Sequence, residues 1–478
     1  MGHHIINEVK QEKFQFSGRA KMIAIVLFVV GAILAGVGAM NVEKHWDDVH
    51  VEHAEDHGAE AEHAEGHGDH HAMLAQAAHT PQDVVPAHSA EDAHAAEEAH
   101  PASGHGEEAH VSDHNGPTWM TRVWANLLLN SYYFWLFAVG ALFFIAVNYV
   151  ANAGWAVMLK RIMEAQTAYL GIGSIILFAV IILGRHELYH WVQYFDGPAA
   201  GDAILDSKHW LLNNSSIFFF IPFVLIVWYG IRFKLRKNST SEDETPGLDM
   251  FKNSTRWSAG FIFFFAFSFS AISWLVIMSI DSHWYSTMFS VYNFAISFVT
   301  ALSVMMLILQ YLKSKGYMEM VSDEVVHDLG KFMFAFCIFW TYIFLSQWLL
   351  IWYTNLPEET VYFDMRLTDH YKPLFFLNIA MCFVLPFFGL MMRNAKRHSW
   401  VLLSAALIIV IGHWVDTYML IMPGTVGEKA GIGMLEIGTT MAFAGLFIYI
   451  VLHSLSKANL YPVNHPYVLE SANHDVGP

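Results

Sequence analysis

The chain has 478 residues, of which 55% are hydrophobic, 15% aromatic and only 14% charged. This composition excludes an ordinary soluble domain, because such domains carry about 25% charged residues. The formal charge of −17 does not indicate a cationic partner, since 18 of the 43 acidic residues fall in the single segment between Glu43 and Arg122. We expect no nucleic-acid partner for so acidic a chain. Cys337 and Cys382 both lie in apolar runs, which leaves no pattern for a disulfide framework, a cysteine-bound iron–sulfur cluster or covalent haem attachment.

Ten apolar runs follow one another along the chain, each near the ~20 residues that cross a bilayer core. They fall at about residues 22–40, 130–152, 168–186, 215–233, 257–280, 287–312, 329–352, 373–392, 399–422 and 434–455. Runs of this length fit helices, and we therefore predict an all-α integral membrane protein, a bundle of ten transmembrane helices in which the lipid bilayer is itself a partner.

The positive charges predict the orientation of this bundle. If the N-terminus is cytoplasmic, the inner segments hold 19 of the 26 Lys and Arg residues and the outer segments hold seven. Such a bias is the usual signature of cytoplasmic loops, so we predict that both termini are cytoplasmic and that the protein is a multi-pass protein of a bacterial inner membrane.

Four regions follow from the runs. Residues 1–42 form an N-terminal tail and the first transmembrane helix, 43–126 an outer (periplasmic) loop, 127–456 a nine-helix membrane domain, and 457–478 a cytoplasmic tail. The first run resembles a signal peptide in having Lys21 before it and small residues at its end. Its apolar stretch is longer than the usual 7–15 residues, which favours a retained helix.

The outer loop is rich in His, Glu, Ala and Gly, and its composition predicts a mobile segment because it has too little apolar surface to bury. It contains 15 of the 28 histidines, and several are four residues apart. On a helix, two histidines with this spacing share a face and can bind Zn²⁺ or Cu²⁺. The alternative is a solvated acidic tether that binds metal loosely. The candidate ligands are His53, His57, His63, His67, His70 and His71.

Polar residues inside the spans are costly in lipid and therefore face a bundle interior or a wet cavity. His413 and Asp416 are three residues apart, so they share one face of the ninth span. Since His titrates near neutrality and a buried carboxylate can be tuned, a chain of such groups can carry protons. The candidates for an outward-opening path are His413, Asp416, Glu436, Asp281, His283, His186 and Glu187. The alternative is that they are interfacial residues and helix-to-helix hydrogen bonds.

Aromatic residues are dense near the span ends, as in interfacial belts, and some could line a slot for a flat quinone. The candidates for such a site are Gln347, Trp348, Asn355 and Tyr418.

Two segments resemble a known family. They are SQWLLIWYTNLPEE at 346–359 and HWVDTYM at 413–419, which leads to Pro423. They resemble the NrfD or polysulfide-reductase type of membrane subunit and, more narrowly, the second such subunit, ActF, of alternative complex III, a quinol:cytochrome c oxidoreductase. The likeness covers all ten spans, whereas the His-rich loop lies outside it.

The resemblance implies a ten-helix NrfD-like bundle without a covalently bound cofactor. Its partners would be an NrfD-like paralogue, an iron–sulfur subunit and cytochrome c subunits that carry the clusters and haem c, with quinone or menaquinone as the lipid-soluble cofactor. We expect the quinol-oxidising paralogue to carry a buried His and Asp in the span that here runs from Trp257 to Ile280. This span has no His, Asp or Glu, so the chain is expected to support quinol oxidation or conduct protons rather than form the catalytic site.

Two other functional classes would also use histidines. A haem-bearing oxidase core needs several buried histidines, and only His413 lies well inside a span. A metal-ion transporter would explain the His-rich loop, but ligands at mid-membrane would be needed. The metal transporter is the alternative to the respiratory subunit.

Overall fold

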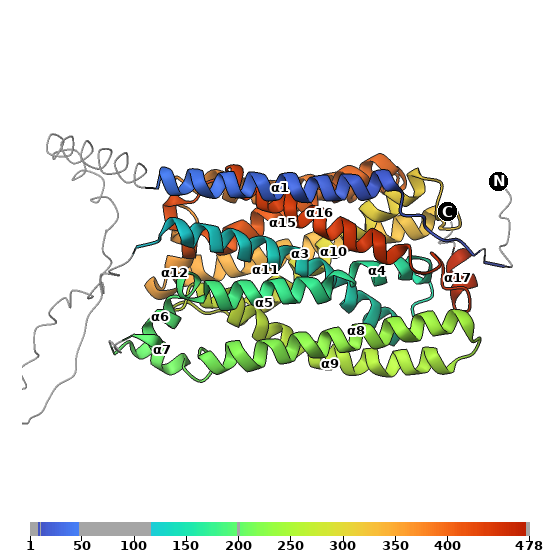
Figure 1. Cartoon of the computed structure of the whole chain (residues 1–478), viewed down its shortest axis with the longest axis horizontal. Helices are drawn as coiled ribbons and strands as arrows, with labels where there is room; N and C mark the ends of the chain where they lie inside the picture. The colour runs from blue at the N-terminus through green and yellow to red at the C-terminus, as the bar shows by residue number, and fades with distance from the viewer. Residues whose placement is uncertain (1–7, 10, 47–115, 198–200, 475–478) are drawn as a thin grey trace, which may run out of the picture. The chain divides into compact units, whose positions relative to one another are not determined.

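The computed structural model describes residues 8–9, 11–46, 116–197 and 201–474. Within these ranges the chain is helical without a β-strand, and all ten predicted spans are confirmed as helices long and apolar enough to cross a membrane (Figure 1). The spans are α1 (Gly18–Lys44), α3 (Trp119–Val150), α4 (Lys160–Gln166) continued by α5 (Tyr169–Leu188), α8 (Ile221–Glu244), α9 (Asp249–Val276), α10 (Phe289–Ser314), α11 (Asp323–Thr354), α13 (Lys372–Ile379) continued by α14 (Leu385–Met391), α15 (Ser399–Thr425) and α16 (Met434–Leu455). Connections contain the short helices α6 (His190–Asp196), α7 (Ala203–Lys208), α12 (Pro357–Asp364) and α17 (Val468–Ala472). The protein is a multi-pass, all-α membrane bundle.

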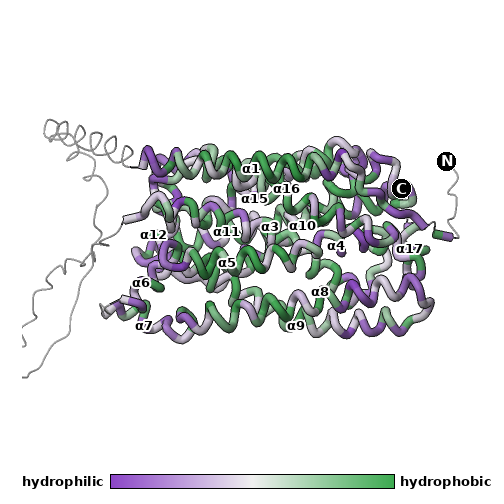
Figure 2. Tube along the Cα trace, in the orientation of Figure 1, coloured by the Kyte–Doolittle hydropathy of each residue, from purple (hydrophilic) through white to green (hydrophobic). Residues whose placement is uncertain are grey.

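The spans differ greatly in burial. The most apolar stretch of α10 is 83% buried and that of α3 78%, whereas those of α1 and α11 are only 17% buried. Helices α3 and α10 therefore form the centre, and α1 and α11 present apolar side chains outward, as spans that face lipid must. The middle of the bundle is hydrophobic and the helix ends are hydrophilic (Figure 2).

Two spans contain a π-helical turn, and proline explains both. The turns are Ser216–Phe220, just before Pro222, and Ala380–Val384, just before Pro386. Proline has no N–H for the carbonyl four residues earlier, so the helix widens by one residue there. The second turn separates α13 from α14 and packs against α15, which places Asn378 and Cys382 beside that helix.

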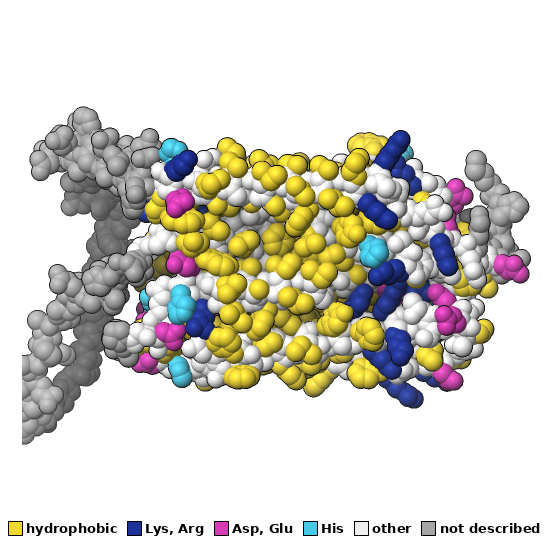
Figure 3. Space-filling view, in the orientation of Figure 1, with side chains coloured by type: hydrophobic (Ala, Val, Ile, Leu, Met, Phe, Trp, Pro, Cys, Tyr) yellow, Lys and Arg dark blue, Asp and Glu magenta, His cyan; other side chains and the backbone are white. Residues whose placement is uncertain are grey.

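Both ends of the described chain lie at one end of the bundle, which we call the termini end; the opposite end is the far end (Figure 1). The Leu460 amide donates to the Glu12 carbonyl at 2.7 Å, and the Met318 amide donates to the Glu12 carboxylate at 3.0 Å. On the visible face, Lys and Arg side chains gather toward the termini end (Figure 3). That this end is cytoplasmic stays a prediction, and a reporter fused after Lys457 that is active only outside the cell would contradict it.

Helix α3 begins earlier than the apolar pattern indicates. The second apolar run starts at about residue 130, but the helix starts at Trp119, with Thr118 as its N-cap. The added turns carry Arg122 and Asn126, which bond to Glu436 on α16. Tertiary hydrogen bonds thus hold polar helical turns that hydropathy cannot recognise, and these turns belong to the range predicted as outer loop.

Candidate functional site

Asp416, on α15, is a buried carboxylate that is bound by side chains of three other helices. Its side chain is 2% exposed. The Tyr292 hydroxyl donates to Oδ1 at 2.5 Å, and the Asn378 amide donates to the same oxygen at 2.8 Å. The Trp340 indole donates to Oδ2 at 2.9 Å. Side chains from α10, α11 and α13 therefore converge on one carboxylate and satisfy both of its oxygens.

His413 lies one turn before Asp416 on the same face, as its spacing predicts, and is fully buried. Its Nδ1 is 3.3 Å from Asp416 Oδ2 and 3.6 Å from the sulfur of Cys382. The Trp340 ring packs against the imidazole at an interplanar angle of 79°. Among the described residues Nε2 has no hydrogen-bond partner. With the proton on Nδ1, the ring donates to Asp416 and leaves Nε2 as an unused acceptor.

A small cavity lies beside Asp416. Its volume is about 30 Å³, and its lining includes Asp416, Asn378, Gln347 and Arg366. A water molecule needs roughly 10–15 Å³ of such volume and two or more polar partners, so there is room for about two waters. The cavity can therefore carry a hydrogen-bonded connection away from Asp416.

Arg366 closes the cavity at its far side. The guanidinium is 4% exposed and lies 2.9 Å from the carboxylate of Asp281. Its Nε donates to the Met419 carbonyl at 2.9 Å. That carbonyl would normally bond to the amide of residue 423, which here is Pro423 and has no N–H. Arg366 thus replaces a helical hydrogen bond that the proline removes.

Neighbouring side chains keep the guanidinium of Arg366 protonated. Burial disfavours the guanidinium, but Tyr362 and Asp281 beside it raise the pKa of Arg366 above its usual range. The guanidinium lies 3.5 Å from the centre of the Tyr362 ring, which stacks on Trp284 with 3.9 Å between ring centroids. A permanent positive charge therefore faces the cavity that reaches Asp416.

Glu436 belongs to a different network from the one predicted. It is fully buried and accepts from Arg122 at 2.9 Å, from Asn126 at 3.1 Å and from the Gly433 amide at 2.8 Å. These partners lie on α3 and at the start of α16, and no hydrogen bond between described residues joins Glu436 to Asp416. Asn130, one turn after Asn126, accepts from Trp414 at 3.2 Å. The network of Glu436 therefore approaches α15 on another side of the helix.

The remaining proton-path candidates lie near the surface of the far end. His283 pairs with Asp202 at 2.6 Å, and its side chain is 52% exposed. His186 is 53% exposed. Glu187 accepts from the hydroxyls of Thr118 and Thr121 at the start of α3. These three residues lie apart from the Asp416 site, whereas Asp281 reaches it through Arg366.

The quinone candidates are not brought together. Gln347 lines the cavity beside Asp416 and donates to the Ser286 hydroxyl at 3.0 Å. Trp348 stacks on Trp352 along α11 at 6.0 Å between centroids. Asn355 ends α11 in the left-handed conformation, and Tyr418 is buried beside Trp414. Of the four, only Gln347 contributes to the small cavity.

The six candidate metal ligands, His53, His57, His63, His67, His70 and His71, lie outside the described residues. Within the described part of the chain, no three His, Cys, Asp or Glu side chains are grouped so that they could hold a metal ion.

A buried ion network near the termini end was not predicted from the sequence. Lys160 pairs with Glu242 at 3.0 Å, and their side chains are 6% and 1% exposed. Arg161 pairs with Glu164 at 2.9 Å and also with Asp243. Lys160 and Arg161 lie between the second and third apolar runs, in a predicted inner segment. The i, i+3 spacing of Arg161 and Glu164 was the one local signal of pairing.

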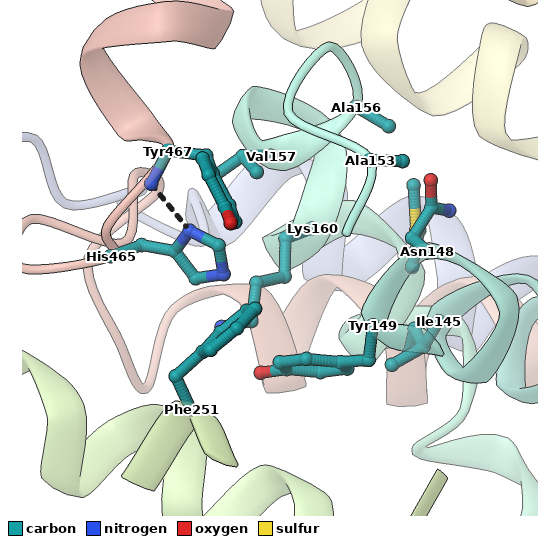
Figure 4. Close-up of a pocket in the computed structure, with 11 residues that line it drawn as sticks. Ile145, Asn148, Tyr149, Ala153, Ala156, Val157, Lys160, Phe251, His465 and Tyr467 are labelled. Atoms are coloured by element: carbon teal, nitrogen blue, oxygen red, sulfur yellow. Dashed lines mark hydrogen bonds between the residues drawn. The ribbon is translucent and has the colours of Figure 1, made fainter. Parts of the chain in front are cut away.

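His465 lies beside this network, in the close-up of Figure 4. Together with Lys160, Tyr149 and Phe251 it lines a cavity of about 20 Å³. The Tyr467 amide donates to its Nδ1 at 3.3 Å. Burial, with Lys160 nearby, lowers the pKa of His465 to about 2, so the imidazole is neutral in the folded protein.

This neutrality predicts a loss of stability in mild acid. The unfolded chain binds a proton at His465 once the pH falls below the ordinary pKa of 6.5. The folded protein binds that proton only near pH 2, because the pKa of His465 is lowered to about 2. Its contribution is therefore complete above pH 6.5 and falls by about 1.4 kcal/mol per pH unit below it. Between pH 7 and pH 5, the wild type should lose about 2 kcal/mol more of its free energy of unfolding than His465→Gln does. Equal pH slopes for the variant and the wild type would contradict a buried neutral imidazole.

No family model matches the sequence, and no curated protein is recognisably similar to it.

Proposed function

We propose that this chain is an integral subunit of a quinol-oxidising respiratory complex of the bacterial inner membrane, and that it conducts protons for that complex. The observation that carries the proposal is the enclosed pair of Asp416 and His413, of which Asp416 lines a cavity large enough for water. Ionisable residues inside a membrane bundle are costly and usually functional. The resemblance of segments 346–359 and 413–419 to NrfD-type subunits supplies the class of complex.

The geometry supports a short relay. His413 can pass the Nδ1 proton to Asp416 Oδ2 across 3.3 Å, and its free Nε2 can take up the next proton. Asp416 can release the proton to water in the cavity, toward Arg366.

Quinol oxidation itself is assigned to a partner subunit of the NrfD-like type. The fifth span of this chain, Asp249–Ile280, has no His or Glu, and its one Asp is the first helical residue. Electrons would pass from the partner to an iron–sulfur subunit and to haem c subunits, and this chain would hold no covalently bound cofactor. A quinone or menaquinone could still contact it, with Gln347 as the candidate residue nearest to Asp416.

Purification of the native assembly in mild detergent tests the proposal. Haem c absorbance and iron–sulfur protein should co-purify with this chain and should support quinol:cytochrome c reductase activity. Isolation of the chain alone, as a homo-oligomer without haem or iron, would overturn it. Metal uptake by liposomes that contain the purified chain tests the alternative function. A metal-ion transporter would take up Zn²⁺ or Cu²⁺, and a respiratory subunit would not.

A further inference from the structure

The largest cavity that we describe is an open apolar groove on the side of the bundle, away from Asp416. Its volume is about 400 Å³, within the range of ligand pockets. Helices α1, α10 and α16 form its walls, with Phe134, Phe137 and Val410 at its floor. From Val304 to Tyr311 on α10, the groove runs about 10 Å along the helix axis at ~1.5 Å per residue. No charged side chain lines it.

The groove exists because α1 packs on one side only. Glycines bring the backbones of α1 and α16 into direct contact, and a Cβ on Gly31 would lie 2.4 Å from the Ala442 amide nitrogen. A helix held so closely to α16 leaves a gap on its other side, toward α10. The groove is apolar and open on the side where α1 presents exposed apolar side chains, so a chain-like apolar occupant is expected.

Three lysines follow closely in sequence after lining residues at the end of the groove that lies toward the termini. Lys21 follows Ala20 of the lining, Lys457 comes one turn and a residue after Leu452, and Lys315 is one turn after Tyr311. The Lys315 ammonium lies 6.0 Å from the centre of the Tyr311 ring. All three lysines are exposed, and none is paired with a described carboxylate.

We propose that this groove binds one anionic phospholipid, with an acyl chain between α1 and α10 and the phosphate at Lys21, Lys315 and Lys457. Basic pockets between transmembrane helices on the cytoplasmic side are suited to anionic headgroups. A quinone fits less well, since the half-buried Tyr311 hydroxyl is the one side-chain donor in the lining and a quinone has two carbonyl oxygens. The lipid would fill the gap beside α1 and hold this poorly buried helix on the bundle.

Native mass spectrometry of the purified full-length chain in its complex, after exposure to phosphatidylglycerol, phosphatidylethanolamine or menaquinone, tests the proposal. The wild type should retain one phosphatidylglycerol in preference to the other two. The triple variant K21Q/K315Q/K457Q should bind it about 100-fold more weakly, because each lysine near a membrane surface contributes about fivefold in affinity. Hydrogen exchange in residues 18–44 should rise with the loss of lipid.

Two further variants distinguish lipid binding in the groove from a general effect of positive charge at this end of the bundle. The triple variant K234Q/K237Q/K252Q removes the same charge from α8 and α9 at the same end and should bind phosphatidylglycerol like the wild type. Ala444→Phe fills the groove without changing charge and should abolish retention. Equal loss in both triple variants, retention by Ala444→Phe, or preferential binding of phosphatidylethanolamine or menaquinone would each overturn the proposal.

Discussion

Replacing Asp416 by Asn is expected to lower quinol turnover and proton release on the order of 100-fold in a complex that still assembles. Asparagine has nearly the same volume, and its oxygen can still accept from Tyr292 and Asn378. It cannot exchange a proton with His413, which is the step that the relay requires. The measurements are quinol:cytochrome c reductase activity and proton release by the purified complex in liposomes.

Matched variants distinguish a relay from a structural hydrogen bond. Thr417→Val changes the next buried residue, whose hydroxyl, among the described residues, bonds only to the His413 carbonyl at 2.8 Å, and should behave like the wild type. Asp416→Leu leaves the donors Tyr292 and Trp340 without partners and should impair assembly. A purely structural Asp416 would make the Asn variant mild and only the Leu variant severe. Wild-type turnover and proton release in Asp416→Asn would show that this relay does not exist.

Replacing Lys160 by Met is expected to destabilise the protein by about 3–5 kcal/mol. The change leaves Glu242 as an uncompensated buried carboxylate, since Lys160 is the only partner that its side chain bonds to among the described residues. The double variant Lys160→Met with Glu242→Leu removes both charges and should recover most of the loss, because well-packed apolar pairs often replace buried ion pairs without cost. The measurement is the free energy of unfolding in detergent micelles.

An exposed pair provides the control. Lys331 lies 2.8 Å from Asp328, and its side chain is 46% exposed. Lys331→Met should therefore change stability by less than about 1 kcal/mol. A Lys160→Met variant that is equally mild, or a double variant as unstable as the single one, would contradict a desolvated Lys160–Glu242 pair.

Hydropathy along the chain predicted the spans well, because the condition for crossing lipid concerns each helix by itself. Every backbone polar group in lipid must be bonded within its own helix, so each span appears as one long apolar run. The closeness of His413 and Asp416 also followed from helical spacing alone. The partners of Asp416 did not, since Tyr292, Trp340 and Asn378 come from three other segments and nothing in the sequence relates them.

By itself, the sequence determined the all-α membrane class, the ten spans and the one helical face that carries His413 and Asp416. Only the tertiary structure decided which helices are central, because lipid and a bundle core are equally apolar, and α1 is no less apolar than α3 although it is far less buried. It also decided that Glu436 pairs with Arg122 on α3, that Arg366 replaces the hydrogen bond lost at Pro423, and that Lys160 is buried rather than solvated. Each of these depends on contacts between residues far apart in the chain, for which hydropathy and spacing carry no signal.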